Sequence, residues 1–440
     1  MTYAQALGFL QQLAQFGYNF GLERIKELLR RAGSPQQKLK VIHIGGTNGK
    51  GSVAVMVNAI LQKAGYRVGL FTSPHLHSYT ERIRINGAAI SETKMAALIE
   101  WFKPMLLAMV KEGYEHPTEF EVLTALALKY FADEKVDLVV LEVGLGGTID
   151  STNVITYPLV SVITNVGKDH MQYLGNTITA IARDKAGIIR EHGIVITAAH
   201  HPEALAVISQ ICAQKEATLY RVGQDITWQQ QYLSPSGGVF NYQGLLNSYT
   251  GLKISLPGRH QLENAATAVA VIEAAVLHHG LKVNSSCIRH GLASAKWPGR
   301  LEIVHRQPLI ILDGAHNYDG ATSLRRALEE VFVYNNLILV IGMLADKERE
   351  KVVALLAPLA AAVIVTRPDN PRAGDWQSLV GVARGFVEQV EVIANISAAL
   401  SRALALAAKT DLICVTGSLY TIASAREWFM KQNKEEFASQ

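Results

Sequence analysis

A glycine-rich turn close to residue 45 holds the side chains with the clearest chemistry in this sequence. The apolar segment Lys40–Ile44 runs directly into Gly-Thr-Asn-Gly-Lys-Gly-Ser at residues 46–52. Glycines lack Cβ atoms, so consecutive backbone N–H groups can converge on an anion, and the positive end of the following helix points to the same place. Lys50 adds a mobile ammonium. The pattern predicts a cradle for the phosphates of a nucleoside triphosphate, formed by Gly46, Thr47, Asn48, Gly49, Lys50, Gly51 and Ser52.

The spacing of this turn differs from that of the common phosphate-binding loop. That loop has a glycine where Ile44 stands and a serine or threonine where Gly51 stands. A plain tight connection between a strand and a helix is the structural alternative, because Gly and Asn favour turns. Lys50 and Ser52 argue against that alternative, so phosphate binding remains the prediction.

A second chemical feature is the carboxylate of Glu142, which ends the apolar run Leu138–Leu141 beside the glycine-rich segment Gly144–Gly147. A carboxylate at the carboxyl end of a buried strand is typical of a metal ligand in a phosphate-binding sheet. Mg²⁺ is the expected ion, because it takes hard oxygen ligands and bridges protein to nucleotide phosphates. A capping carboxylate is the alternative for Glu142.

These side chains need a scaffold, and the sequence predicts a parallel sheet with helical connections. Apolar segments of strand length alternate with helical patterns over the first two hundred residues or so. The expected strands are Lys40–Ile44, Arg67–Thr72, Asp137–Val143, Leu159–Thr164 and Ile194–Ala198. The expected helices are Lys50–Ala64, Ser91–Lys111, Glu119–Asp133, Thr177–Arg190 and Pro202–Gln214.

The next segments change character twice. Residues 225–256 carry short alternating runs separated by Ser, Gly and Pro, which predicts antiparallel hairpins, and a helix is expected at His260–His279. Pro and Gly in Trp297–Arg300 mark an interdomain junction. A smaller Rossmann-like series follows, with strands expected at Leu309–Leu312, Leu337–Ile341, Ala362–Thr366, Val390–Ile393 and Leu412–Thr416. We therefore predict an α/β protein with domains at residues 1–297 and 298–440.

Bulk composition narrows the class of protein. The chain has 440 residues and a formal net charge of +4, with no basic run interleaved with aromatics, so nucleic-acid binding is not expected. Cys212, Cys287 and Cys414 lie far apart without CxxC spacing and are expected to be buried thiols in a reducing compartment. No signal peptide and no run of roughly 18 apolar residues is present. We expect a cytoplasmic monomer that does not contact membranes.

Further segments, taken in order, resemble one family over essentially the whole chain. Together with the short form of the phosphate turn, they are similar to folylpolyglutamate synthase, a member of the Mur ligase superfamily. The segments are Phe71–Leu76 with Tyr79–Arg82, Thr118–Glu121, Leu141–Gly147 running to Asp150–Asn153, Asp169–His170 with Leu174–Gly175, Asp184–Ile189, Leu312–Asn317 and Thr416–Tyr420.

The resemblance implies an ATP-dependent amide ligase that adds L-glutamate to a folate through an acyl phosphate. Dihydropteroate is a second possible acceptor, as in dihydrofolate synthase, and the sequence leaves both open. A Mur-type peptidoglycan-precursor ligase is disfavoured, because only about forty residues precede the phosphate turn. A P-loop ATPase without ligase activity is an alternative from another class. A dinucleotide-binding oxidoreductase is weaker still, because Gly144–Gly147 lacks the third glycine of that fingerprint.

The resemblance also implies roles for individual residues. The implied Mg²⁺ ligands are Ser73, Glu142 and His170, and Lys185 is implied to be carbamylated. Asn264, Arg300 and Asp313 are implied nucleotide contacts, which would place ATP between the two domains. The implied pteridine-side residues are Phe20, Gly21, Leu22, Thr118, Glu119, Phe120, Glu121, Asp150 and Ser151, and those for the incoming glutamate are His316, Ser418 and Tyr420. Asp184, where many relatives carry glutamate, and Lys168, where an apolar residue is common, depart from the family pattern near the metal site.

Overall fold

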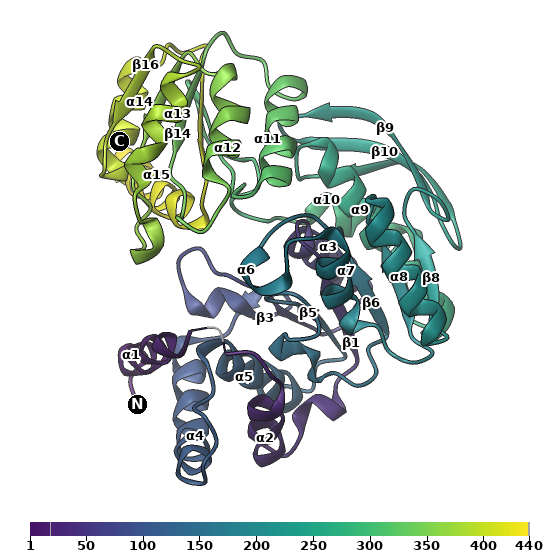
Figure 1. Ribbon diagram of the computed structural model, residues 1–440. Helices are drawn as coiled ribbons and strands as arrows, with labels where there is room; N and C mark the ends of the chain where they lie inside the picture. The colour runs from purple at the N-terminus through teal and green to yellow at the C-terminus, as the bar shows by residue number, and fades with distance from the viewer. Residues whose placement is uncertain (18, 439–440) are drawn as a thin grey trace. The chain divides into compact units, whose positions relative to one another are not determined.

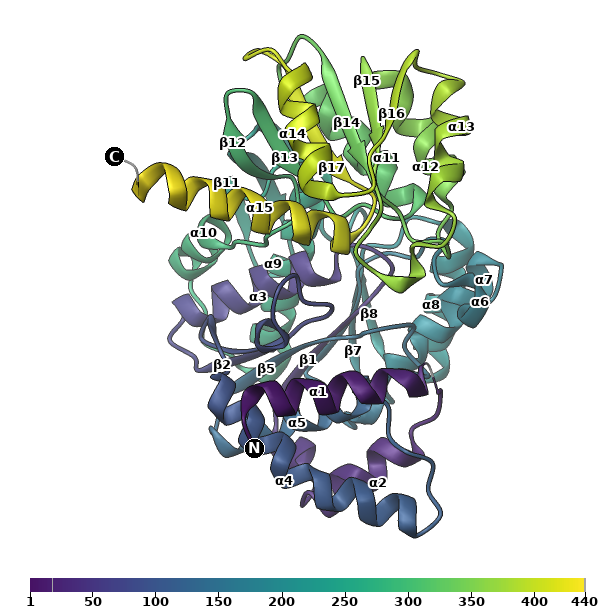
Figure 2. The ribbon, with the colours of Figure 1, turned by 90° about the vertical axis from the view of Figure 1, so that its left-hand side faces the viewer.

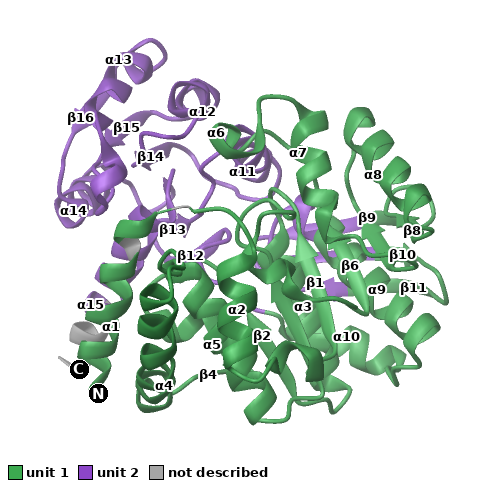
Figure 3. Ribbon diagram, turned by 60° about the horizontal axis from the view of Figure 1, so that its bottom comes forward, with its two compact units in different colours: residues 1–229, 241–252, 263–295 green, residues 230–240, 253–262, 296–440 purple. Residues whose placement is uncertain are grey.

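The computed structural model describes residues 1–17 and 19–438 and divides into two compact units. Unit 1 comprises residues 1–229, 241–252 and 263–295, and unit 2 comprises residues 230–240, 253–262 and 296–440 (Figure 3). Each unit is built around its own sheet. No helix among the described residues is long and apolar enough to cross a membrane.

The sheet of unit 1 has eight strands in the order β4-β3-β2-β5-β1-β6-β7-β8. Strands β2, β5, β1, β6, β7 and β8 are parallel, and β3 is antiparallel to both of its neighbours, β2 and the edge strand β4. The strands are β1 (Val41–Gly45), β2 (Val68–Phe71), β3 (Ile83–Ile85), β4 (Ala88–Ala89), β5 (Leu138–Glu142), β6 (Val160–Ile163), β7 (Ile194–Thr197) and β8 (Thr218–Arg221). The five predicted strands are confirmed, while the short strands β3, β4 and β8 were not predicted.

Helices cover both faces of this sheet because its strands are apolar on both sides. Phe71, Val139 and Leu141 pack under the first, second, fourth and fifth helices, while the alternate residues Ile42 and Val140 are buried on the other face. There α3 and α10 lie together (Figure 2). The helices are α1 (Tyr3–Leu13), α2 (Glu23–Arg31), α3 (Lys50–Lys63), α4 (Glu92–Lys111), α5 (Glu119–Asp133), α6 (Met171–Leu174), α7 (Ile178–Lys185), α8 (Pro202–Gln214), α9 (Arg259–His279) and α10 (Ser285–Ser294).

The predicted hairpins between the parallel series form a three-stranded sheet in the order β11-β10-β9. Its strands are β9 (Thr227–Ser234) and β10 (Gly237–Gln243) (Figure 1), and β11 (Ser248–Ile254) (Figure 3). The buried carboxylate of Glu273 on α9 holds the turn between β10 and β11. It accepts the Tyr242 hydroxyl at 2.9 Å and the amides of Leu245 and Asn247 at 2.8 and 3.1 Å.

The sheet of unit 2 has the order β12-β13-β17-β14-β15-β16, parallel except for β12. Its strands are β12 (Glu302–Arg306), β13 (Leu309–Leu312), β14 (Leu337–Ile341), β15 (Ala362–Val365), β16 (Gln389–Val392) and β17 (Leu412–Thr416), and its helices are α11 (Tyr318–Glu330), α12 (Arg349–Leu356), α13 (Leu379–Arg384), α14 (Ile396–Leu406) and α15 (Leu419–Ala438). Because β17 returns to a position between β13 and β14, the order of the parallel strands reverses there, and such a switch point is where open α/β sheets bind ligands. The predicted α/β class, with an antiparallel extension and a smaller Rossmann-like sheet, is confirmed.

The three thiols are all free. Cys212 and Cys414 are buried as predicted. The prediction is wrong for Cys287, which is half-buried near the start of α10 and whose thiol donates to the Lys63 carbonyl at 3.3 Å.

Candidate active site

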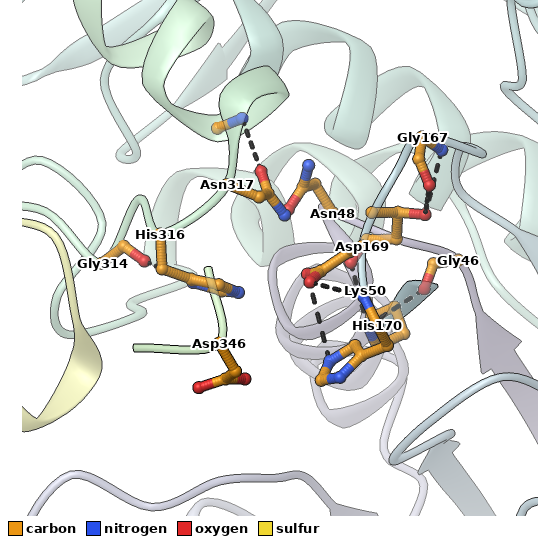
Figure 4. A network of polar contacts seen from close by, with 12 residues as sticks. Gly46, Asn48, Lys50, Gly167, Asp169, His170, Gly314, His316, Asn317 and Asp346 are labelled. Carbon is orange, nitrogen blue, oxygen red and sulfur yellow. Dashed lines mark hydrogen bonds and ion pairs between the residues drawn. The ribbon is translucent and has the colours of Figure 1, made fainter. Parts of the chain in front are cut away.

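The predicted phosphate cradle is the turn between β1 and α3, and the loop after β6 holds it in place. The Thr47 amide donates to the Asn165 carbonyl at 3.0 Å. The Thr47 hydroxyl donates to the Gly167 carbonyl at 3.1 Å and accepts the Gly167 amide at 3.0 Å (Figure 4). The Asn48 amide donates to the Asn165 side chain at 2.8 Å. The turn therefore has a fixed shape, which is what a preformed anion site requires.

Two lysine side chains meet at this turn. Lys50, the first residue of α3, donates to the carbonyls of Gly46 and Thr47 at 3.0 and 3.1 Å. Lys185, at the end of α7, donates to the same Gly46 carbonyl at 3.0 Å and is only 3% exposed. Burial, with the nearby ammonium of Lys50, lowers the pKa of Lys185 to about 7. Taken alone, Lys185 would be expected to be a solvated surface residue, and the structure instead places it beneath the cradle.

The cradle also touches a residue that the family resemblance implies for nucleotide binding. Gly49 has φ of +85°, and a Cβ atom there would lie 2.5 Å from the side-chain oxygen of Asn264 on α9. The structure thus brings Asn264 against the turn within unit 1. A left-handed backbone and an occupied Cβ position together explain why glycine stands at residue 49.

We expect Gly49→Ala to weaken binding of a non-hydrolysable ATP analogue at least about tenfold, about 1.4 kcal/mol, because the new methyl must displace Asn264 or reshape the turn. Titration calorimetry measures this affinity. Gly65→Ala is the matched control, since Gly65 has φ of +88° but nothing within 4 Å of its Cβ position. Equal affinities for the two variants would show that a methyl group at residue 49 does not disturb the cradle.

Two candidate magnesium ligands, Ser73 and Glu142, lie at the ends of the adjacent strands β2 and β5, and the third, His170, follows β6. Glu142 ends β5 opposite Ile44 of β1, and its carboxylate accepts the Ser73 amide at 3.1 Å. His170, at the start of α6, has its Nε2 atom 4.0 Å from the Asp169 carboxylate, and both side chains lie beside Lys50 (Figure 4). In the part of the chain that the structure describes, no three His, Cys, Asp or Glu side chains form a closed metal cage. This donor set fits Mg²⁺, which takes one or two carboxylates and completes its shell with water and phosphate oxygens.

The pteridine-side candidates divide into exposed and buried groups. The Phe20 ring is 38% exposed and meets the Tyr173 ring edge-on, with centroids 5.2 Å apart. Phe120 instead packs against Phe71, with ring centroids 5.9 Å apart, and a Cβ atom on Gly144 would collide with it at 2.5 Å. Gly21 and Leu22 lie in the loop beside Phe20. The structure therefore presents Phe20 and uses Phe120 largely for packing.

Thr118 and Glu121 form the N-terminal capping box of α5, which explains why this helix begins where it does. The Glu121 carboxylate also accepts Arg24 Nε at 3.2 Å, and both side chains are buried. Glu119, the first residue of α5, is partly buried, and burial raises the pKa of its carboxyl group. The two predicted segments near residues 20 and 120 are thus joined by a buried ion pair.

Removal of the Glu121 carboxylate should destabilise the folded protein. We expect Glu121→Ala to lower the free energy of unfolding by about 3 kcal/mol, because it leaves the Arg24 charge buried with a poorer set of partners. Urea denaturation followed by circular dichroism measures the change. Glu134→Ala is the control, since the Glu134–Arg67 pair is exposed and should contribute under about 1 kcal/mol. A loss no larger than that of the control would show that Arg24 does not depend on Glu121.

The remaining candidates lie in unit 2 at the carboxyl ends of β13 and β17, which are neighbours. The buried Asp313 carboxylate accepts the amides of Leu301 and Ala315 at 3.0 and 2.9 Å, and burial raises its pKa although Arg300 is nearby. His316 hydrogen-bonds the Gly314 carbonyl through Nδ1 at 2.9 Å (Figure 4). The Ser418 hydroxyl accepts the Tyr420 amide at 3.1 Å. The structure gathers these residues at the switch point of this sheet.

Some residues of the cradle were missed from the sequence. Asn165 and Gly167 hold Thr47 and Asn48, and the Thr164 hydroxyl donates to the Asn48 carbonyl at 2.6 Å. All three follow β6, the parallel neighbour of β1. Their position at the carboxyl end of a strand adjacent to the cradle was the available signal.

Comparisons with known proteins agree with this arrangement. Residues 44–272 match the Mur ligase middle domain, and residues 299–419 match the Mur ligase glutamate ligase domain. A dihydrofolate synthase/folylpolyglutamate synthase of Bacillus subtilis is 36% identical over 97% of this chain and 99% of its own length.

Solved structures give the same result. Folylpolyglutamate synthase of Mycobacterium tuberculosis complexed with ADP has a TM-score of 0.91 at 34% identity, covering 97% of this chain and 99% of that one. The Escherichia coli relative in complex with DHPP and ADP has a TM-score of 0.87 at 31% identity, covering 98% and 99%. The chain therefore belongs to the Mur ligase family and, within it, to the folylpolyglutamate and dihydrofolate synthases, which are ATP-dependent glutamate ligases.

Proposed function

We propose that this enzyme joins L-glutamate to a folate, and also to dihydropteroate, at the expense of ATP. The observation that carries the proposal is the meeting of Lys50 and Lys185 on the Gly46 carbonyl, in a turn beside the Ser73–Glu142 pair. Two lysine nitrogens at one strand end, beside the N-terminus of α3, favour a polyphosphate over a neutral ligand. The DHPP and ADP held by the Escherichia coli relative support a pterin compound as the acceptor.

A carboxylate is a poor acyl donor, so the reaction needs activation before the amide bond forms. The acceptor carboxylate attacks the γ-phosphorus of ATP, ADP leaves, and the resulting acyl phosphate is attacked by the glutamate amine with release of phosphate. Lys50 neutralises charge that develops on the phosphate oxygens, and the ordered turn positions them. No serine or cysteine nucleophile is needed.

Ser73, Glu142 and His170 would hold Mg²⁺, whose contribution when bound is to neutralise the negative charge of the phosphates. Asn264, Arg300 and Asp313 remain the predicted nucleotide contacts, and His316, Ser418 and Tyr420 the predicted contacts of glutamate. Thr118–Glu121 and Asp150–Ser151 remain predictions for the acceptor side, together with Phe20–Leu22.

Purified enzyme with ATP, Mg²⁺ and glutamate tests the proposal, offered either dihydropteroate or a reduced folate. We expect phosphate release only when a pteridine acceptor is present. With ¹⁸O in the acceptor carboxylate, one label should appear in the released phosphate, because that oxygen leaves with the phosphoryl group. Phosphate release without an acceptor would favour a plain ATPase, and unlabelled phosphate would exclude the acyl phosphate.

The partners we propose are therefore small molecules, and we propose a monomer that acts in the cytoplasm. Light scattering during gel filtration measures the mass against the 48.0 kDa expected for one chain. A mass of twice that value would contradict the monomer.

A further inference from the structure

A buried chain of hydrogen bonds leads from the middle of β1 to the loop that follows β5. His43 is fully buried, and its Nε2 atom lies 2.8 Å from the Thr152 hydroxyl. Thr152 in turn donates to one Asp150 oxygen, from its amide at 2.9 Å and from its hydroxyl at 2.5 Å. The other Asp150 oxygen accepts the Leu145 amide at 2.7 Å. These hydrogen bonds thus join β1, the central strand of unit 1, to both ends of the loop at residues 144–152.

The direction of these hydrogen bonds fixes which ring nitrogen of His43 carries the proton. The Thr152 hydroxyl has a single proton, which it gives to Asp150, so it can only accept from His43. His43 must therefore carry its proton on Nε2. Its Nδ1 atom is buried and has no hydrogen-bond partner among the described residues. Burial, with Arg190 nearby, lowers the pKa of His43 to about 3, so the ring is neutral at physiological pH.

The protein occupies most of the acceptor capacity of the Asp150 carboxylate. A carboxylate offers about four acceptor positions. Here three hydrogen bonds reach it, from the amide and hydroxyl of Thr152 and from the amide of Leu145. A carboxylate held in this way fixes the backbone around it.

A second clamp holds the far side of the same segment. Arg190 donates to the Asn153 carbonyl and side-chain oxygen at 3.0 and 2.6 Å, and to the Ile155 carbonyl at 3.0 Å. The short helix Ser151–Val154 therefore lies between two donors, the buried His43 and the partly buried Arg190. Ser151 opens that helix, so its position depends on both.

We propose that His43 is a positioning residue for the acceptor: through Thr152 and Asp150 it fixes the loop at residues 144–151 in the shape that receives the pteridine substrate. This inference rests on the proposed function. The phosphate cradle is held separately, by the bonds of Thr47 and Asn48 to the loop after β6. We call the hydrogen-bonded series His43–Thr152–Asp150 the relay. Its loss should therefore weaken acceptor binding and leave ATP binding unchanged.

Thr152→Val tests the relay, because it keeps the shape of the side chain and removes the hydroxyl. We expect the Kd and KM of the acceptor to rise about 10- to 100-fold, as when a supporting hydrogen-bond partner is removed. The Kd of an ATP analogue should stay within about twofold, and Thr152→Ser should restore acceptor affinity. Thr124→Val is the matched control, since Thr124 is buried in the same unit but its hydroxyl has no partner among the described residues. Acceptor affinity unchanged by Thr152→Val would overturn the proposal.

Two further measurements separate a relay from general destabilisation. His43→Leu combined with Thr152→Val should weaken acceptor binding no more than either change alone, because both remove one relay; additive losses would overturn the proposal. Long-range ¹H–¹⁵N spectra of the unmodified enzyme should show His43, assigned by the loss of its signals in His43→Leu, as the Nε2–H form from pH 5 to 8. A ring protonated on Nδ1 would also overturn it, even if Thr152→Val fails to fold. Calorimetric Kd values need no turnover, so enzyme that binds the pteridine without ligating it contradicts the proposed function alone.

Discussion

Replacement of Lys50 by alanine should lower the rate of ligation by about a thousandfold or more and leave the fold intact. Lys50 is held over the turn by the carbonyls of Gly46 and Thr47. It is therefore already in place when the γ-phosphoryl group is transferred, and cationic contacts to that group contribute about 10³- to 10⁵-fold in comparable enzymes. Ligation is measured as acceptor-dependent phosphate release at saturating ATP.

Two control variants test whether the loss of rate is specific to the Lys50 ammonium. Lys63→Ala removes an exposed lysine at the other end of α3 and should leave the rate unchanged. Lys50→Arg keeps the charge but replaces a compact ammonium by a planar fork, so it should recover only a small part of the rate. A Lys50→Ala enzyme with a normal melting temperature and normal turnover would end the assignment of this turn as the phosphate cradle.

The cradle was predictable because its determinants are local. An apolar strand, a glycine-rich turn, a lysine and a helix follow one another within about 25 residues, so periodicity and turn chemistry were enough. The parallel series was predictable for the same reason. The short strands β3 and β4 were not, because three and two residues carry too little pattern to be distinguished from a turn.

The long-range contacts of the site could not be predicted from local sequence patterns. Glu121 and Arg24 are 97 residues apart, and Lys185 meets Gly46 across 139 residues. Whether a lysine is buried depends on which loop packs over it, and sequence spacing does not specify that. His43 illustrates the same limit, because a polar residue inside an apolar strand gives no sign of its partner Thr152, 109 residues away.

The family resemblance and the structure contribute different parts of the site. The resemblance implied Lys185 as a functional residue without a physical reason visible in the sequence, and the structure supplies one in its burial beside Lys50. For Asp150 the resemblance implied substrate contact, while its geometry favours support of the loop. Residues that act through others are hard to separate from residues that touch ligand when only a motif is known.

Replacement of Lys185 should also remove most of the ligase activity. The extent of the loss should depend on whether a carboxylic acid is added to the assay. An amine whose pKa is lowered from 10.5 to about 7 is largely neutral at pH 8, and a neutral amine is the form that adds CO₂ to give a carbamate. We expect Lys185→Ala to lose at least about 100-fold in rate, the usual cost of removing a group that organises transition-state charge. A short carboxylic acid added to the assay should restore part of it, because it replaces the missing anion.

The pH dependence follows from the same shift, with a definite sign. As pH falls through about 7, the Lys185 amine becomes protonated, and carbamate formation and activity should both fall. The stability contributed by this lysine should decline as pH falls from the unfolded pKa of 10.5 toward about 7, because only the unfolded chain binds the proton over that interval. Lys215→Ala is the matched control, since that lysine also donates to a main-chain carbonyl, of Ile189, without contacting the cradle. Full activity of Lys185→Ala, or equal stimulation of Lys215→Ala by the same acid, would remove Lys185 from the mechanism.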